Sequence, residues 1–301
     1  MYYTSLPDHK EPGFDEQLHF SQFRNQNIIF NALASKSVCE NHVGCLSFKT
    51  VMNGEEWYGI NNHRKAVRFG QFLILNDDQT YSSSIDMEGE VRSISVFFRK
   101  EFATAVFHDA VSSEETLLDT PFDSGNKSLE FFQTLYAVDS ELQQQLICLL
   151  SGLNNWGYDA NKVDEHLTFL LNHVIRSHKV EKYRADQINA IKPGTRTEIY
   201  KRLCIAKDLL HSTFNNKLDL SIISTEACLS TPQLIRQFKA AFQTTPHQYL
   251  TRIRLVHAAK LLKQTKAHVN EITLKCGFED ASAFGRAFKI EFGVTPLYFR
   301  G

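Results

Sequence analysis

The feature that most constrains this chain is a repeat close to its C-terminal end. Residues 234–246 read LIRQFKAAFQTTP, and residues 284–296 read FGRAFKIEFGVTP. Fifty positions apart, the two stretches share basic, aromatic and Thr-Pro positions. The shared positions are Arg236/Arg286, Phe238/Phe288, Lys239/Lys289, Phe242/Phe292, Thr245/Thr295 and Pro246/Pro296. The repeat predicts that one structural unit occurs twice in this region.

Each copy has the spacing of an amphipathic helix. Leu234, Phe238 and Phe242 recur every four residues and form an apolar side, while Arg236 and Lys239 lie on the opposite side. The second copy repeats this arrangement over 281–292. A short helix is expected before each copy, at 219–227 and 269–276, so each unit has the pattern of a helix-turn-helix.

Cap and break signals delimit the neighbouring helices. Ser230 with Gln233, and Thr245 with Gln248, have the form of capping boxes. A helix is predicted over 196–212, and a long helix follows Pro246. In this long helix we expect four apolar residues to pack inward and three basic residues to remain solvated. The apolar residues are Tyr249, Ile253, Val256 and Leu262. The basic residues are Arg252, Arg254 and Lys260.

Charge is divided unequally along the 301 residues. From residue 195 onward the chain has 16 Lys and Arg against 8 Asp and Glu, a net charge of +8. The totals of 33 and 34 leave 17 against 26, a net charge of −9, for residues 1–194. A basic C-terminal region indicates a polyanionic partner. The polar, acidic N-terminus and the lack of a long apolar run predict a cytoplasmic protein without a membrane segment.

The region 196–301 resembles the DNA-binding domain of the AraC/XylS family of bacterial transcription regulators. The resemblance is carried by the FK pair, the spaced phenylalanines, the TP ending, the long helix and the run CGFEDASAFGRAFKIEFGVTPLYFR. It implies two helix-turn-helix subdomains joined by the long helix, with the second helix of each in the major groove. We therefore expect promoter DNA as partner and RNA polymerase as a transient partner.

Residue by residue, the resemblance implies a DNA-facing set on each reading helix. The set is Pro232, Ile235, Arg236 and Lys239 in the first copy, and Ala281, Ser282, Gly285, Arg286 and Lys289 in the second. Arg236 and Arg286 suit bidentate contacts to guanine, whereas Lys239 and Lys289 suit phosphate. A solvated helix face is the alternative explanation for the arginines.

Five positions depart from the family pattern. Pro232 and Ile235 stand where hydrogen-bonding side chains would be expected, and Gly285 leaves a gap at a base-facing position. Cys228 stands where the first turn usually has glycine, and Gln243 replaces the glycine that Gly293 supplies in the second copy. Cys228 and Cys276 are interpreted as small core residues. The six cysteines are scattered without a CxxC pair, which indicates reduced thiols instead of a metal or disulfide framework.

The N-terminal part has the pattern of short β-strands over 18–100. Asn53-Gly54 suits a hairpin turn. The stretch around Gly70 and FLILND resembles the cupin-like β-barrel that this family uses as a sensor, which implies a small-molecule effector. Trp57, Tyr58 and Tyr81 are candidates for a pocket lining or for core packing. No HxH pair occurs, so we expect no metal, no cofactor and no catalytic residue.

Residues 129–153 and 161–178 are expected to be helical. Val163, Leu167, Leu170 and Val174 follow a spacing that suits either packing on the barrel or a short coiled-coil seam. The family resemblance favours a homodimer through this helix.

The fold class expected is therefore α+β, in four parts. These are a cupin-like β-barrel sensor domain at 1–125, a dimerising helical segment at 126–181, a linker at 182–195, and an all-α double helix-turn-helix domain at 196–301. The function expected is a ligand-responsive transcription activator and not an enzyme. The alternatives are a metal-dependent cupin enzyme with an appended nucleic-acid module and an architectural DNA binder without a ligand.

Overall fold

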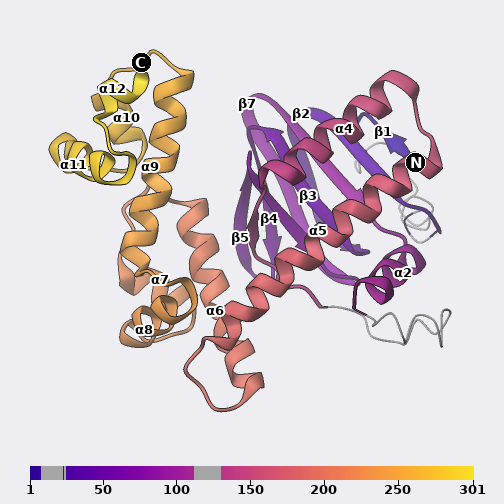
Figure 1. The fold of residues 1–301 in the computed structure, drawn as a ribbon, viewed down its shortest axis with the longest axis horizontal. Helices are drawn as coiled ribbons and strands as arrows, with labels where there is room; N and C mark the ends of the chain where they lie inside the picture. Colours follow the sequence, from indigo (N-terminus) through magenta and orange to yellow (C-terminus); the bar gives the residue numbers. More distant parts are fainter. Residues whose placement is uncertain (8–22, 24, 112–129) are drawn as a thin grey trace. The chain divides into compact units, whose positions relative to one another are not determined.

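The computed structural model describes residues 1–7, 23, 25–111 and 130–301. Within these ranges the chain forms two compact units, Met1–Lys182 and Tyr183–Gly301, called the N-terminal and C-terminal units below. The first consists mainly of a sheet with helices, and the second consists of helices (Figure 1). None of the helices in the described ranges is long and apolar enough to cross a membrane.

The N-terminal unit is built on an eight-stranded sheet (Figure 1). Its strands are β1 (Tyr2–Tyr3), β2 (Ile28–Gly44), β3 (Ser47–Asn53), β4 (Glu55–Ile60), β5 (His63–Arg68), β6 (Gln71–Leu75), β7 (Gln79–Phe97) and β8 (Leu135–Ala137). The main order is β1-β2-β7-β3-β6-β8, and β4 joins β7 and β5 beside it. This path is open in the described residues, so the closed cupin-like barrel is not confirmed.

Strand β7 is the centre of this sheet. It pairs antiparallel with β2 from Ile28↔Phe97 to Gly44↔Gln79. On its other side it pairs with β3 and, further along, with β4. Three ladders therefore depend on one strand of 19 residues.

The predicted hairpin at Asn53-Gly54 is wrong. β3 and β4, which flank this pair, do not pair with each other but both pair with β7. The two-residue hairpin of this region joins β4 to β5, where Asn61 and Asn62 have φ of 50° and 66°. Asparagine tolerates the left-handed conformation that such a turn requires.

Three helices complete the described part of the N-terminal unit: α2 (Lys100–Val111), α4 (Ser140–Trp156) and α5 (Ala160–Asp186). Figure 1 shows α4 and α5 crossing one face of the sheet. The predicted helix at 129–153 is wrong before residue 140, because Leu135–Ala137 is strand β8, which pairs with β6.

The apolar seam of α5 is buried in the core. Val163, Leu167, Leu170 and Val174 are at most 3% exposed and share one hydrophobic cluster with side chains of the sheet, such as Phe72. Packing on the sheet is therefore the alternative that the structure supports. This seam is not available to a second chain, and the homodimer stays a prediction.

The C-terminal unit contains seven helices after the end of α5. They are α6 (Pro193–Ser212), α7 (Leu220–Glu226), α8 (Thr231–Phe242), α9 (Pro246–Gln264), α10 (Val269–Lys275), α11 (Ala281–Phe292) and α12 (Pro296–Arg300). The sequence-based helices of this region are confirmed. The linker predicted at 182–195 includes the last turn of α5 and the first residues of α6.

Candidate nucleic-acid interface

The two repeats form matching helix-turn-helix units, α7 with α8 and α10 with α11. In each, the shared Thr-Pro pair begins the next helix. Thr245 and Gln248 form the predicted capping box of α9, and the Thr295 hydroxyl accepts from Tyr298 N at the start of α12. The capping box predicted for Ser230 is absent, since no side-chain bond caps α8 there.

The turns inside the two units follow similar backbone paths. Cys228 has φ of 51° in the first turn, and Gly277 has φ of 78° in the second. The next residue in each turn donates its backbone N–H to the preceding helix: Leu229 to Ser224 O over 2.9 Å, and Phe278 to Thr273 O over 3.1 Å. Cys228 is exposed, so its prediction as a core residue is wrong, whereas Cys276 is fully buried.

Helix α8 presents a basic face to solvent. Leu234 and Phe238 are fully buried, while Arg236 and Lys239 are exposed. Of the other two predicted residues, Pro232 is exposed and Ile235 is half-buried. The structure thus brings all four predicted positions to the outer part of one helix.

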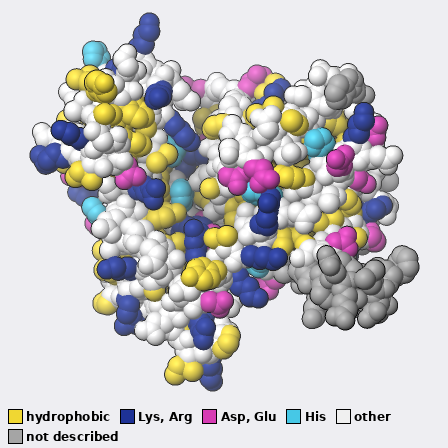
Figure 2. Space-filling model, viewed as in Figure 1, with side chains coloured by type: hydrophobic (Ala, Val, Ile, Leu, Met, Phe, Trp, Pro, Cys, Tyr) yellow, Lys and Arg dark blue, Asp and Glu magenta, His cyan; other side chains and the backbone are white. Residues whose placement is uncertain are grey.

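Helix α11 repeats this arrangement with a different surface. Phe284 and Phe288 are fully buried, and Arg286 and Lys289 are exposed. Ala281 and Ser282 are exposed at the first turn, and Gly285 is half-buried; these complete the predicted set. Figure 2 shows Lys and Arg side chains spread over the visible face of the C-terminal unit.

Arg254 on the long helix α9 contacts the segment between α6 and α7 and the turn between α10 and α11. Its Nε donates to Phe214 O over 2.7 Å and its Nη2 donates to Asn216 O over 2.9 Å, just after α6. Its guanidinium also lies 5.8 Å from the ring centroid of Phe278 in the second turn. Burial lowers the pKa of Arg254. The prediction that Arg254 is a solvated residue is therefore wrong. The prediction that Val256 packs inward is also wrong, because this residue is 41% exposed.

Two more residues support α8 and α11 and were not identified from the sequence. Asp280 accepts from Ser282 N over 3.0 Å and from Ala283 N over 2.8 Å, which caps α11 and holds the pKa of this carboxyl below its ordinary value. An Asp before a helical pattern is a cap signal that could have identified it. Gln237 is 2% exposed and accepts from Asn189 N over 3.2 Å, which ties α8 to the segment after α5.

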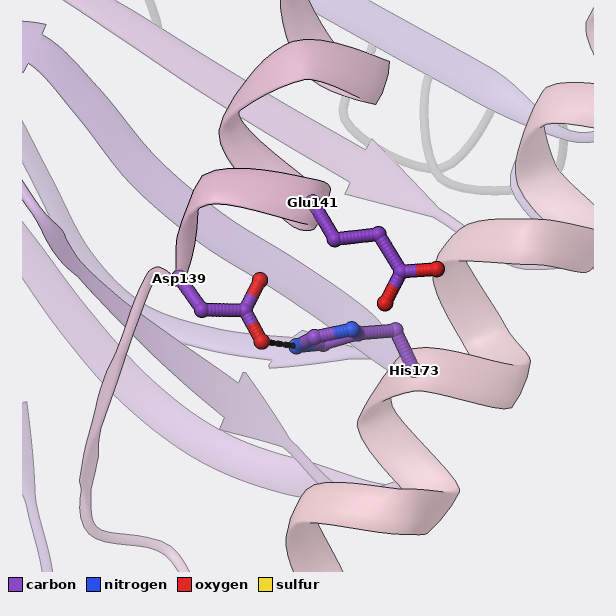
Figure 3. Close-up of side chains that lie close together, drawn as sticks. All are labelled: Asp139, Glu141 and His173. Atoms are coloured by element: carbon purple, nitrogen blue, oxygen red, sulfur yellow. Dashed lines mark ion pairs between the residues drawn. The ribbon is translucent and has the colours of Figure 1, made fainter.

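A separate cluster in the N-terminal unit brings together three side chains of the kinds that bind metal ions (Figure 3). Asp139 precedes α4, Glu141 lies in its first turn, and His173 projects from α5 toward both carboxylates. Their nearest ligand atoms lie within 4.8 Å of one another, and His173 Nε2 is 3.7 Å from Asp139 Oδ2.

The neighbouring cation accounts for this cluster without a metal. Arg176 Nη2 lies 3.2 Å from Glu141 Oε2 and 3.4 Å from His173 Nδ1. Asp139 Oδ1 is already used, because it accepts from Leu142 N and caps α4. The cluster therefore fits a polar connection between α4 and α5, and burial lowers the pKa of His173.

Comparison with known proteins identifies the C-terminal region. The family model of the helix-turn-helix domain matches residues 223–301. The transcriptional activator RhaS of Escherichia coli O139:H28 (strain E24377A / ETEC) is 34% identical over 99 residues, which are 33% of this chain and 36% of RhaS. RhaS of Escherichia coli strain K12 / DH10B gives the same identity and coverage.

The C-terminal part of this chain is an AraC-type helix-turn-helix domain. The family resemblance predicted from the sequence is thereby confirmed for this part. The chain covers only about a third of the length of these relatives, so their match describes the AraC-type domain and not the N-terminal unit.

Two solved structures are also similar to the chain. ToxT from Vibrio cholerae O395 is 13% identical, with coverage of 91% of this chain and 96% of ToxT and a TM-score of 0.35. The DNA-binding domain of AdpA, solved in complex with a target DNA, is 23% identical, with coverage of 33% and 89% and a TM-score of 0.32. At these TM-scores neither likeness carries an argument about the AraC-type domain.

Proposed function

We propose that this protein is a sequence-specific DNA-binding transcription regulator and not an enzyme. The observation that carries the proposal is the repeated basic face: Arg236 and Lys239 on α8, and Arg286 and Lys289 on α11, are all exposed at matching positions. The net charge of +8 from residue 195 onward favours a polyanion. The relatives that match the AraC-type domain are transcriptional activators, and activation is proposed for this chain too.

The proposed DNA contacts are the nine residues predicted on the two reading helices. These are Pro232, Ile235, Arg236, Lys239, Ala281, Ser282, Gly285, Arg286 and Lys289. Helix α9 follows α8 and leads to the second helix-turn-helix. It has 19 residues and a length of roughly 28 Å. Such a helix is suited to hold two readers near the ~34 Å spacing of successive major grooves on one face of DNA.

The wider proposal includes promoter DNA, a small-molecule effector sensed by the N-terminal unit, a homodimer and transient contact with RNA polymerase. It needs no cofactor and no membrane. Because the α5 seam is buried, a homodimer would have to use another surface.

The test is selection of bound sequences from a random DNA pool by the full chain, followed by binding measurements over a salt series. We expect one enriched site with two unlike halves and an affinity that falls as salt rises. Arg236→Ala and Arg286→Ala should each relax preference in a different half by about 1–3 kcal/mol. Arg252→Ala, an exposed α9 arginine paired with Glu291, is the matched control and should preserve the preference.

Enrichment of no sequence would contradict a sequence-specific regulator. Binding that is strong but indifferent to sequence at every salt concentration would instead support the architectural DNA binder.

A further inference from the structure

The N-terminal unit buries a lysine in the middle of its sheet. Lys49 lies on β3, opposite Leu73 of β6 and Ser95 of β7, and is 2% exposed. Its Nζ lies 3.6 Å from the ring centroid of Phe97 and 5.4 Å from that of Tyr81. Among the described residues, none accepts a hydrogen bond from Nζ or pairs with it within 4.0 Å.

A lysine ammonium has three donors, and burial without acceptors is costly. The Phe97 ring attracts the ammonium through its face but accepts a conventional hydrogen bond from none of the three donors. Burial lowers the pKa of Lys49 to about 7, against an opposing effect of Glu56. Within the described residues, the donors of Lys49 Nζ are therefore unused, and burial disfavours the charged form of this side chain.

Lys49 lines a cavity of about 60 Å³. This volume is about four to six times the roughly 10–15 Å³ needed for one water. Aromatic rings of Phe30, Phe97 and Tyr81 form part of the lining, and Ser83 adds a hydroxyl. The space is suited to a molecule of a few non-hydrogen atoms with one apolar side.

The second charged group of the cavity selects the charge of such a molecule. Glu56 is 5% exposed and accepts from Ser93 Oγ over 2.6 Å, so one of its oxygens is already bonded. Burial raises the pKa of Glu56, and any negative charge on this carboxyl opposes a dianion such as phosphate more strongly than a monoanion bonded to Lys49. A carboxylate offers two acceptor oxygens and a single charge.

We propose that this cavity binds a small monocarboxylate, whose oxygens accept from Lys49 Nζ and whose apolar part lies against the Phe97 and Tyr81 rings. The site itself stands on this geometry. Its role as the effector site rests on the proposed function.

The first experiment is calorimetric titration of the full chain with sodium acetate, lactate and pyruvate, compared with chloride and phosphate at equal ionic strength. We expect saturable binding of at least one carboxylate and weaker or no binding of phosphate and chloride. Lys49→Met should weaken binding at least tenfold. Lys36→Met removes an exposed charge from β2 and is the matched control, which should bind within about twofold of the unchanged chain.

A second measurement needs no variant, in case Lys49→Met does not fold. Titrations of the unchanged chain in buffers of different ionisation enthalpy report proton uptake. Near pH 8 a bound carboxylate should draw a proton onto Lys49, and near pH 6 uptake should be small. Because burial raises the pKa of Glu56, the same titration of Glu56→Gln should keep this uptake if Lys49 takes the proton. The titratable groups around Lys49 are Glu56, Tyr58, Tyr81, Cys39, Cys45 and His42. Burial raises the pKa of Cys45 to about 12 and that of Tyr81 well above its ordinary value, so neither supplies charge in this window.

Three results would overturn the proposal: no carboxylate binds, phosphate or chloride binds equally well, or the Lys49 and Lys36 variants bind alike. DNA binding is measured separately on the same preparations. Carboxylate binding without DNA binding would keep the site and reject the regulator, and the reverse would reject the site alone.

Discussion

Arg254 Nε on α9 donates to the carbonyl oxygen of Phe214 over 2.7 Å. Phe214 lies two residues beyond Ser212, the last residue of α6. The same guanidinium donates to Asn216 O. One side chain thus fixes the segment between α6 and α7 to α9, the helix that leads to the second helix-turn-helix.

Replacing Arg254 should reduce the stability of the C-terminal unit. Arg254→Lys keeps the charge but cannot donate to both carbonyl oxygens with the same planar group, so we expect a loss of about 1–3 kcal/mol in the free energy of unfolding. Urea denaturation measures it. Arg252→Lys is the matched control, because its exposed ion pair with Glu291 is worth about 1 kcal/mol or less. Equal losses would contradict the role given to Arg254.

Cys228→Gly and Gln243→Gly should stabilise the AraC-type domain. Both residues have left-handed backbones, with φ of 51° and 59°, which cost a side chain about 1 kcal/mol that glycine avoids. We expect each change to raise Tm by a few degrees, as measured by thermal unfolding under reducing conditions. An unchanged or lower Tm for both would show that their side chains contribute more than the backbone costs.

Gly277 and Gly293 of the second helix-turn-helix, which match Cys228 and Gln243 of the first, should lose unequal amounts of stability when replaced by alanine. A Cβ at Gly277 would lie 2.9 Å from Asn215 O and 3.1 Å from Arg254 Cζ, whereas nothing lies within 4 Å of a Cβ at Gly293. Both have positive φ, so both changes should destabilise, with Gly277→Ala costing at least about 1 kcal/mol more. Chemical denaturation of the two variants compares them directly, and equal costs would contradict the close packing around Gly277.

Lys239 and Lys289 are expected to contact phosphate. Lys239→Gln and Lys289→Gln should weaken binding uniformly across DNA sequences, and each should reduce the slope of log affinity against log salt by about 1. Lys36→Gln, an exposed change in the N-terminal unit, is the control and should preserve the slope. A change of sequence preference without a change of slope would assign these lysines to bases.

The N-terminal unit should become less stable as pH falls below about 6.5. His178 is 8% exposed between the rings of Phe131 and Phe132, and burial followed by the charge of Lys182 lowers its pKa. Since the folded state favours the neutral ring, its stability is retained above the unfolded pKa of about 6.5 and is lost as pH falls from there toward the folded pKa.

His178→Gln should therefore reduce the loss of Tm between pH 7.5 and pH 5.5, as measured by thermal unfolding. Exposed His247→Gln is the control and should keep the full loss. Part of the loss should persist in the first variant, because burial also lowers the pKa of His173. An unchanged loss in His178→Gln would contradict the prediction.

The helices of the C-terminal unit could be predicted because their signals are local. Phenylalanines four residues apart and a Thr-Pro start are sufficient to place α8, α9 and α11. Spacing could not predict that Arg254 is partly buried, because its two carbonyl acceptors, Phe214 and Asn216, lie 40 and 38 residues away in sequence. It also placed Val256 inward, although the neighbouring Leu255 is the buried residue.

The N-terminal unit was harder to predict because its pairings are distant in sequence. An Asn-Gly pair favours a hairpin only if the flanking strands pair with each other, and β3 and β4 pair with β7 instead. The apolar spacing of α5 fits a sheet as well as a second helix, so the seam alone could not choose between them. Lys49 gave no signal, since an isolated lysine in a strand is ordinarily exposed.

The use of β7 by three partner strands limits how the length of this unit can vary. One residue inserted in β7 would turn every later side chain to the opposite face, and β2, β3 and β4 would all have to shift their pairing. The Asn61–Asn62 turn connects only β4 and β5, so extra residues there disturb a single hairpin. Relatives of this unit should therefore differ in length at that turn and hold β7 constant.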